Sequence, residues 1–455
     1  MELTASAWAQ QQWGSCRFGD RRLTTRAVHL GQGMAAHPDG SLPKQMGDRT
    51  ALVGAYRLLN NPRVTAAELW RPHQVATRTA AEQTPVVLFV QDWTTLDYTA
   101  HAATQGIGPV GSRQQQGMLL HSVLAVTPTE RQVLGWAYGE VRIRPGQPRG
   151  RRQRGRQPET EADAWERAVV AIGPAPAGVL WVHVSDRESD IYEYWQACRR
   201  LGNGFVVRAR QNRCLWDEAR GRASTEHLLA HVRAWPAATD PATRYAVAVP
   251  ATRTTPARSA TVCLAWGHVT LAPPAYVRPQ NPLRVWMVRA WEPDPPPGSE
   301  RVEWLLATSQ VVETPAMAQQ IVAWYMCRWL VEDFHQCLKT GCRIEHSQLD
   351  HADDLQRLLG FAVPIAVRLL QLRQAVRATP DQSAQTQVDP LTVELLARHF
   401  QVAAVTLTVH DFWRLVARLG GHPGRKSDGP PGWRTLWYGW QRLSDWLTGA
   451  RLAAP

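Results

Sequence analysis

The chain has 455 residues, 44% of them hydrophobic, and its 51 Lys and Arg against 39 Asp and Glu give a formal net charge of +12. That composition is typical of a globular protein with two or three domains. The basic charge favours a polyanionic partner, and the absence of a basic amphipathic anchor favours nucleic acid over a membrane. No apolar run reaches 18 residues, so we expect no transmembrane helix.

Compartment and metal chemistry are constrained by two further features. The opening sequence MELTASAWAQQQWG has no basic region followed by an apolar core, so we expect no signal peptide. The seven cysteines are scattered and form no CxxC pair, which argues against a zinc site or a disulfide framework and fits a reducing cytoplasm.

Residues 1–70 are predicted to be helical. Asp20 can cap a helix over 21–37, whose early turns carry Arg21, Arg22 and Arg26. A second helix over Thr50–Leu59 ends at an Asn-Asn-Pro sequence. A small basic module that grips DNA and an ordinary helical lid are both consistent with this pattern.

Two aspartates follow short apolar runs that are typical of buried strands. Asp92 comes directly after the run at 85–91, and Asp186 directly after the run at 179–185. The whole order, β-β-β-α-β-α-β, predicts a ribonuclease-H-like α/β core, in which the first and fourth strands are central neighbours. A lone Asp at a strand end is usually turn chemistry, but two in this topology are expected to lie side by side. Asp97, Glu188 and Asp190 are nearby acids, and Asp97 is interpreted as structural.

Two segments interrupt this core. Residues 145–158 are rich in Pro, Gly and Arg, with five Arg between 149 and 156, and predict either a solvated loop or a loop that grips phosphate. Residues 211–311 change to alternating strand patterns with Pro-rich turns, which indicates a β-rich insertion. Helices are expected again over 355–377 and through the aromatic-rich C-terminal segment.

The stretch Gln320–Gly341 contains no Pro and predicts one helix of six turns. On a wheel with about 100° per residue, one arc of roughly 80° collects Tyr325, Arg328, Glu332, His335 and Lys339. This face is either a solvated surface with ion pairs at helical spacing, or a carboxylate for a metal with cations and a Tyr for phosphates.

The spacing Tyr325-x2-Arg328-x3-Glu332-x6-Lys339 resembles the Tyr-Arg-Glu-Lys signature of bacterial insertion-sequence transposases. More narrowly, it is similar to the cut-and-paste, Tn-five-like branch of insertion-sequence group four. QDWTTLDY and SDRESDIYEY resemble the strand-end motifs of the same family. The resemblance implies a metal triad of Asp92, Asp186 and Glu332, whose hard oxygen ligands suit two Mg²⁺ or Mn²⁺ ions.

The resemblance also implies contacts to DNA. Tyr325, Arg328 and Lys339 would hold the strand that is not transferred. Arg208 and Arg210, on the strand FVVRAR, would contact the backbone, and Arg208 matches the family position more closely. Trp304 in VEWLLATS is either core packing or the position where the family stacks a flipped base. His335 is either a proton partner or a plain neighbour.

At the level of the whole chain, the resemblance implies a transposon-end DNA-binding domain over 1–70, a catalytic domain over 71–372 and a helical dimerisation domain over 373–455. The resemblance to the DNA-binding domain rests on two segments, GDRRLTTR and GAYRLLNNPRVTA. The chain departs from the family pattern in the Arg-rich loop, in 250–300 and in 378–405, which affects end specificity and dimer details more than the reaction.

The favoured hypothesis is therefore a bacterial cytoplasmic transposase, associated with the nucleoid when bound to DNA, which acts as a homodimer on double-stranded transposon ends and target DNA. End nicking, hairpin formation, hairpin opening and strand transfer would reuse one active site. The alternatives are a ribonuclease-H-like nuclease that cuts without joining, and a DNA-binding regulator without turnover.

Overall fold

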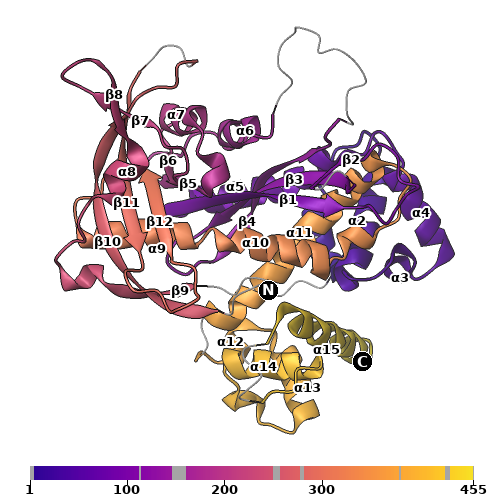
Figure 1. The fold of residues 1–455 in the computed structure, drawn as a ribbon. Coiled ribbons are helices and arrows are strands. Elements are labelled where there is room, and N and C mark those ends of the chain that lie inside the picture. The colour runs from indigo at the N-terminus through magenta and orange to yellow at the C-terminus, as the bar shows by residue number, and fades with distance from the viewer. Residues whose placement is uncertain are drawn as a thin grey trace.

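The structure is a computed structural model that describes residues 5–111, 114–145, 160–249, 257–276, 281–378, 381–425 and 431–453. The Arg-rich segment 149–156 lies outside the described residues. The chain begins with five helices (Figure 1): α1 (Ala5–Trp13), α2 (Arg21–Ala36), α3 (Leu42–Met46), α4 (Arg49–Leu59) and α5 (Ala66–Glu82). Asp20 caps α2 as predicted, because its carboxylate accepts a hydrogen bond from the Arg22 backbone N–H at 2.9 Å.

The central sheet has the strand order that the sequence predicts. Its core strands are β1 (Val86–Asp97), β3 (Gln116–Val126), β4 (Val133–Arg142), β5 (Leu180–Ser185) and β6 (Gly204–Arg208), with a short β2 (Gly108–Pro109) at the edge of β3. They lie in the order β4-β3-β1-β5-β6, with β1, β5 and β6 parallel to one another and β3 antiparallel to both of its neighbours. This is the ribonuclease-H-like arrangement, and it makes β1 and β5 central neighbours.

Alternate residues of β1 belong to separate cores, as a pleated strand requires. Leu88 and Val90 pack in one cluster with Phe334 of the later helices. Val87 and Phe89 point to the opposite face, which α6 (Asp163–Ile172) covers beside α7 (Tyr192–Arg200). Even-numbered positions of β1 therefore face the helices that follow the insertion. Asp92 is even-numbered, so its side chain lies on that same face of the sheet.

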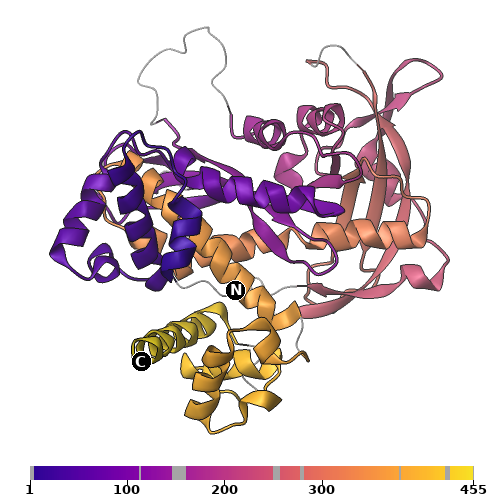
Figure 2. The same cartoon turned by 180° about the vertical axis from the view of Figure 1, so that it is seen from behind.

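The predicted β-rich insertion extends the core sheet. It contains β7 (Cys214–Asp217), β8 (Arg222–His227), α8 (Leu228–Arg233), β9 (Tyr245–Val249), β10 (Arg258–Leu271), β11 (Leu283–Trp291) and β12 (Glu303–Thr308). β12 pairs antiparallel with β6, so core and insertion form one sheet of twelve strands among the described residues. In Figures 1 and 2 the insertion and the N-terminal helices lie at opposite ends of this sheet.

The predicted continuous helix over 320–341 is wrong. The structure has α9 (Pro315–Met326), α10 (Trp329–Gln336) and then a π-helical segment, Cys337–Gly341. Between α9 and α10 the backbone N–H groups of Cys327 and Arg328 bond three residues back, which tightens the turn. A tight turn followed by a wide one destroys the constant step of about 100° that the helical wheel assumes.

The predicted helix over 355–377 is present as α11 (Ala352–Ala378), with Pro364 inside it. By length and composition its segment Ala352–Leu372 could cross a membrane, with a mean hydropathy of 1.3, but 78% of that window is buried inside the protein. In this structure α11 is a core helix that packs on α5 and β4.

The C-terminal helices pack below the sheet (Figure 1) and comprise α12 (Ala384–Gln387), α13 (Pro390–Phe400), α14 (Val409–Leu419) and α15 (Trp433–Ala453). α15 also reaches the N-terminal helices. The Tyr438 hydroxyl donates to an Asp39 carboxylate oxygen at 3.0 Å, and the Gln441 side-chain amide donates to the Ala36 carbonyl at 2.6 Å.

Candidate active site

Asp92 lies inside β1, so the prediction that the strand ends before it is wrong. The parallel pairing with β5 stops at Val90 opposite Val184. The antiparallel pairing with β3 continues through Asp92 opposite Ser122 and on to Asp97. Antiparallel partners therefore hold Asp92 in extended backbone after its parallel neighbour has turned away. Its side chain is mostly covered, with 18% exposed.

Asp186 is the first residue after β5, as predicted. Its carboxylate accepts a hydrogen bond from the Glu188 N–H at 2.7 Å and caps a 3-10 turn, Arg187–Ser189. The sequence between Asp186 and Leu201 predicts one helix that begins at Asp186; this is wrong, because the 3-10 turn comes first and α7 begins only at Tyr192. Asp92 and Asp186 each lie two residues beyond the last parallel pair of β1 and β5, so the sheet places them side by side.

Glu332 is in the first turn of α10, on the side of the sheet that Asp92 faces. Arg328 joins the two acids: one guanidinium nitrogen lies 3.1 Å from Asp92 Oδ2, and another lies 2.7 Å from Glu332 Oε1. The Arg328 side chain is 10% exposed, whereas that of Glu332 is 53% exposed. The predicted solvated face is therefore only partly correct, because the arginine at its centre is buried.

The charges of Asp186 and Glu332 both act on the carboxylate of Asp92. Burial raises the pKa of Asp92 to about 7, the Arg328 guanidinium opposes this shift, and the neighbouring carboxylates of Asp186 and Glu332 add to it. Functional sites often place carboxylates so close together that each raises the pKa of the other.

Beside the acids lies an aromatic and basic cluster of predicted DNA contacts. Trp304 and Tyr325 are buried, with ring centroids 5.7 Å apart. Burial raises the pKa of Tyr325, while the charges of Arg328 and Arg208 oppose the shift. Arg208 donates to the Glu303 carbonyl at 3.0 Å. The structure thus brings four of the predicted DNA contacts together around the edge of the triad.

Other predicted residues lie elsewhere. Lys339, shifted by the π-helical segment, is 3.6 Å from a Glu345 carboxylate oxygen, and Glu345 in turn accepts from the Asp97 N–H at the far end of β1. The side chain of Asp97 accepts hydrogen bonds from Thr99, in agreement with a structural role.

His335 is buried, and burial lowers its pKa to about 3, so it is neutral at physiological pH. This favours the plain-neighbour interpretation. Arg21, Arg22 and Arg26 are exposed on α2, and the side chain of Arg22 pairs with Asp20 at 2.9 Å. Arg26 also lines a groove between α2 and α4 together with Arg49 and Arg57, two exposed arginines that the sequence reasoning missed.

Asp190, one of the acids near Asp186, holds the loop at the outer edge of the site. Its buried carboxylate accepts from the backbone N–H groups of Arg210 and Gln211 at 2.7 and 2.6 Å, and from the Arg213 guanidinium at 2.6 Å. Asp190 therefore ties the loop after Asp186 to the segment that presents the exposed Arg210. Its partners are twenty or more residues away in sequence, so no local pattern signals the role.

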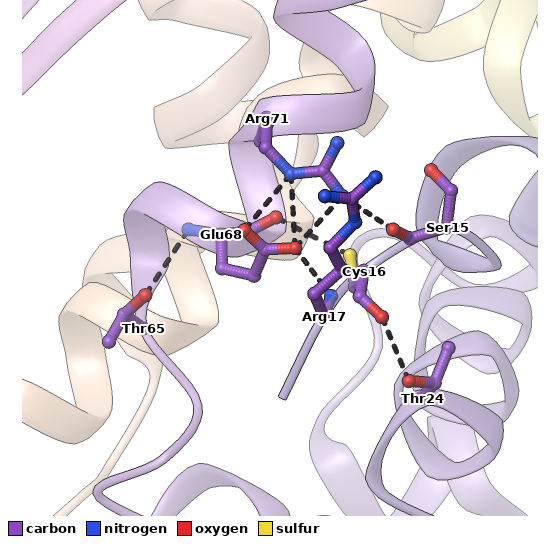
Figure 3. Close-up of polar contacts among 7 residues, drawn as sticks. All are labelled: Ser15, Cys16, Arg17, Thr24, Thr65, Glu68 and Arg71. Carbon is purple, nitrogen blue, oxygen red and sulfur yellow. Dashed lines mark hydrogen bonds and ion pairs between the residues drawn. The ribbon is translucent and has the colours of Figure 1, made fainter. Parts of the chain in front are cut away.

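A second missed cluster joins the N-terminal helices to α5 (Figure 3). The Glu68 carboxylate accepts from the Arg17 backbone N–H and from the Arg71 guanidinium, and Arg71 also donates to the Ser15 carbonyl. The Thr24 hydroxyl donates to the Cys16 carbonyl at 3.0 Å and ties the same loop to α2. We refer to Ser15, Arg17, Glu68 and Arg71 as the Glu68 latch.

Three family models match this chain: transposase DNA-binding over residues 5–64, transposase DDE domain over 182–363, and transposase Tn5 dimerisation domain over 365–455. With the mixed sheet and its acids, they define the chain as a DDE transposase, a metal-dependent enzyme that cleaves DNA and transfers strands. The succession of the three domains places it in the Tn5-like family of these transposases. The DDE match includes Asp186 and Glu332 and begins after Asp92.

Among solved structures, the chain is similar to a cryo-EM structure of the piggyBac transposase synaptic complex with hairpin DNA. Sequence identity is 9%, the match covers 96% of this chain and 73% of that chain, and the TM-score is 0.34.

DDE transposase domains generally depend on divalent metal ions, and the acids of this site fit such ions in chemistry. Asp92, Asp186 and Glu332 supply only hard carboxylate oxygens. Among the described residues, however, no three metal-binding side chains are already arranged as a ligand set. The guanidinium of Arg328 holds an oxygen of Asp92 and an oxygen of Glu332 instead.

Proposed function

We propose that this enzyme performs cut-and-paste DNA transposition with Asp92, Asp186 and Glu332 as the ligands of two Mg²⁺ or Mn²⁺ ions. The observation that carries the proposal is the convergence of the acids from β1, β5 and α10, which is reflected in the raised pKa of Asp92. Bound divalent ions would supply positive charge for in-line phosphoryl transfer.

The surrounding residues suit a DNA strand laid across the acids. Arg328 and Arg208 would bind backbone phosphates through their planar guanidinium groups, with the Tyr325 hydroxyl as a further donor. Trp304 would receive an extruded base, since stacking on an indole offsets part of the unstacking cost. Arg210, which the loop held by Asp190 presents to solvent, and Lys339 would contact the backbone farther out.

The predicted sequence of steps is end nicking, attack of the freed 3′ hydroxyl on the opposite strand to form a hairpin, hairpin opening, and joining to target DNA. The partners would be double-stranded transposon ends, held by α2 with Arg21, Arg22 and Arg26, and a second copy of the chain. We place this reaction in the bacterial cytoplasm, on nucleoid DNA. Domain limits of 1–70, 71–372 and 373–455 remain part of the proposal.

A cleavage assay tests the proposal. The protein, Mg²⁺ and duplex DNA carrying the element's own ends are incubated and resolved on a denaturing gel, with wild type compared with Glu332→Ala. Wild type should give nicks, hairpins and joined products, and Glu332→Ala none of them. Glu188→Gln is the matched control, because Glu188 is an exposed carboxylate two residues from Asp186 that is not in the proposed triad.

The outcomes separate the competing functions. Cleavage without hairpins or strand joining would support the ribonuclease-H-like nuclease instead. Binding of DNA without cleavage by wild type would leave a non-catalytic regulator. Equal activity of wild type and Glu332→Ala would show that the carboxylate of α10 takes no part in the reaction.

A further inference from the structure

Arg328 occupies an unusual position for a residue with a proposed DNA contact. Its guanidinium is almost fully buried and bridges two of the three proposed metal ligands, Asp92 and Glu332. The tightened turn between α9 and α10 places it there, with its backbone N–H bonded to the Tyr325 carbonyl at 3.0 Å. Its guanidinium carbon lies 5.9 Å from the centroid of the Tyr325 ring.

A divalent ion bound by the proposed triad would coordinate the same carboxylate oxygens of Asp92 and Glu332 that Arg328 now holds. A guanidinium satisfies carboxylates with several directed hydrogen bonds and one positive charge. A metal ion must therefore replace these bonds, and the displaced arginine would be left buried without a partner, which is costly. Glu332 is the most exposed of the three acids, with more than half of its side chain exposed, so its carboxylate has room to change partners.

A DNA phosphate offers the arginine a replacement partner. Phosphate oxygens accept the same forked donors as a carboxylate, and a strand laid across the site would bring them next to the acids. Once Arg328 turns to a phosphate, the oxygens of Asp92 and Glu332 are free for a cation.

We infer that Arg328 is an internal counter-ion that competes with the divalent metal, and that binding of the DNA backbone to Arg328 opens the metal site. This inference rests on the proposed triad and adds to it a coupling between metal binding and DNA binding. Such a coupling is reciprocal, so metal must strengthen DNA binding by the same factor. It would keep the free protein poorly loaded with metal and confine the active state to the DNA complex.

The test measures Mn²⁺ binding to the full chain at pH 8 by electron paramagnetic resonance of the free ion. Arg328→Gln should bind Mn²⁺ about tenfold more tightly than wild type, toward the lower end of the usual range for couplings. Arg328→Lys should lie between them, because lysine keeps the charge but not the fork. Arg131→Gln is the matched control: Arg131 is exposed and donates to the Met326 carbonyl at the end of α9, away from the acids.

A second arm adds a blunt duplex that carries the transposon end without flanking DNA, so no flanking strand remains for the enzyme to cut away. The duplex should raise the Mn²⁺ affinity of wild type and of Arg131→Gln, and should leave that of Arg328→Gln nearly unchanged. Circular dichroism confirms that each variant is folded, and Arg328→Lys carries the test if Arg328→Gln is not.

Failure of the inference and failure of the proposed function look different. If Glu332→Gln loses Mn²⁺ binding while both Arg328 variants bind no more tightly than wild type, the carboxylate site stands and the role of Arg328 is overturned. If Glu332→Gln binds Mn²⁺ as wild type does, the proposed metal triad itself is wrong.

Discussion

The indole of Trp304 packs against the phenol ring of Tyr325, with centroids 5.7 Å apart, and the Trp329 ring lies 6.0 Å away at a steep angle. Only 6% of Trp304 is exposed. In this arrangement the aromatic neighbours already cover the ring that is proposed to stack on a flipped base. A base can therefore reach it only if Tyr325 or Trp329 moves, so Trp304 has a packing role in the free protein besides any role with DNA.

Replacement of Trp304 should separate these two roles. Trp304→Ala removes a large buried side chain and should lower the free energy of unfolding by about 3–5 kcal/mol. At a temperature where it remains folded, it should still nick DNA but form few hairpins, because an extruded base loses its stacking partner. Trp304→Phe should be more stable than Trp304→Ala and recover part of the hairpin yield. Urea unfolding and a denaturing gel measure the two effects, and normal hairpin formation by Trp304→Ala would restrict Trp304 to packing.

Asp92 should make the free protein less stable as the pH rises. Its folded-state pKa is raised to about 7, above the ordinary value of 3.8, mainly because the carboxylate is buried. The folded state therefore binds the proton more tightly, and the resulting stability is complete below pH 4 and is lost as the pH rises through 7. Asp92→Asn should accordingly gain stability relative to wild type between pH 4 and pH 8, on the order of a few kcal/mol, in thermal melts with a chelator present.

Asp97 provides a control of opposite sign on the same strand. Hydrogen bonds from Thr99 hold the pKa of Asp97 below its ordinary value. Its contribution to stability is present above the unfolded-state pKa and is lost as the pH falls through the folded-state pKa. Asp97→Asn should therefore lose stability relative to wild type at pH 8 and approach it in acid. Parallel pH profiles for the two variants would contradict this assignment.

The sequence predicts the strand order because each core strand is an apolar run bounded by turn residues, and such runs need no tertiary information to be recognised. The positions of Asp92 and Asp186 follow from that order. The end of β1 does not follow: Thr94 and Thr95 continue the strand after the apolar run has finished, because β3 still pairs with them. Pairing partners, which the local pattern does not contain, determine where the strand stops.

The helical wheel fails for a similar reason. No Gly or Pro marks the tight turn at Cys327 and Arg328. A break there brings Arg328 between Asp92 and Glu332, and an ion pair across 236 residues cannot be read from local spacing. The π-helical segment then moves Lys339 toward Glu345. The local sequence pattern therefore contains neither the burial of these side chains nor their mutual contacts.

Loss of Asp190 should be costly although it is not a proposed metal ligand. Its side chain is fully buried, and that of its partner Arg213 is 11% exposed. Asp190→Ala would leave two backbone N–H groups without their acceptor, and the buried Arg213 guanidinium would keep only its bond to the Asp190 backbone carbonyl. The loss should cost roughly 3–5 kcal/mol. Asp190→Asn keeps an acceptor oxygen and should lose less. Urea unfolding measures both variants, and a cost below about 1 kcal/mol for Asp190→Ala would show that the loop relaxes and water replaces the carboxylate.

The Glu68 latch (Figure 3) should control how firmly the loop before α2 is held. Burial alone would raise the pKa of Glu68, but hydrogen bonds from Arg71 and the Arg17 N–H outweigh it and hold the pKa below its ordinary value. Glu68→Ala removes the acceptor shared by these donors and should cost about 1–3 kcal/mol. Faster hydrogen exchange of the backbone amides of residues 15–20, with weaker binding to end DNA in fluorescence anisotropy, is the expected result.

A matched change on the same helix tests whether the Glu68 latch is specific. Glu82 pairs with Arg78 at 2.8 Å on α5, but the two side chains are 40% and 47% exposed, and such surface pairs contribute little. Glu82→Gln should therefore leave exchange at 15–20 and DNA affinity unchanged. If Glu68→Ala and Glu82→Gln behave alike, the loop does not depend on the latch. If Glu68→Ala speeds exchange without weakening DNA binding, the latch fixes the loop but the loop does not present α2 to DNA.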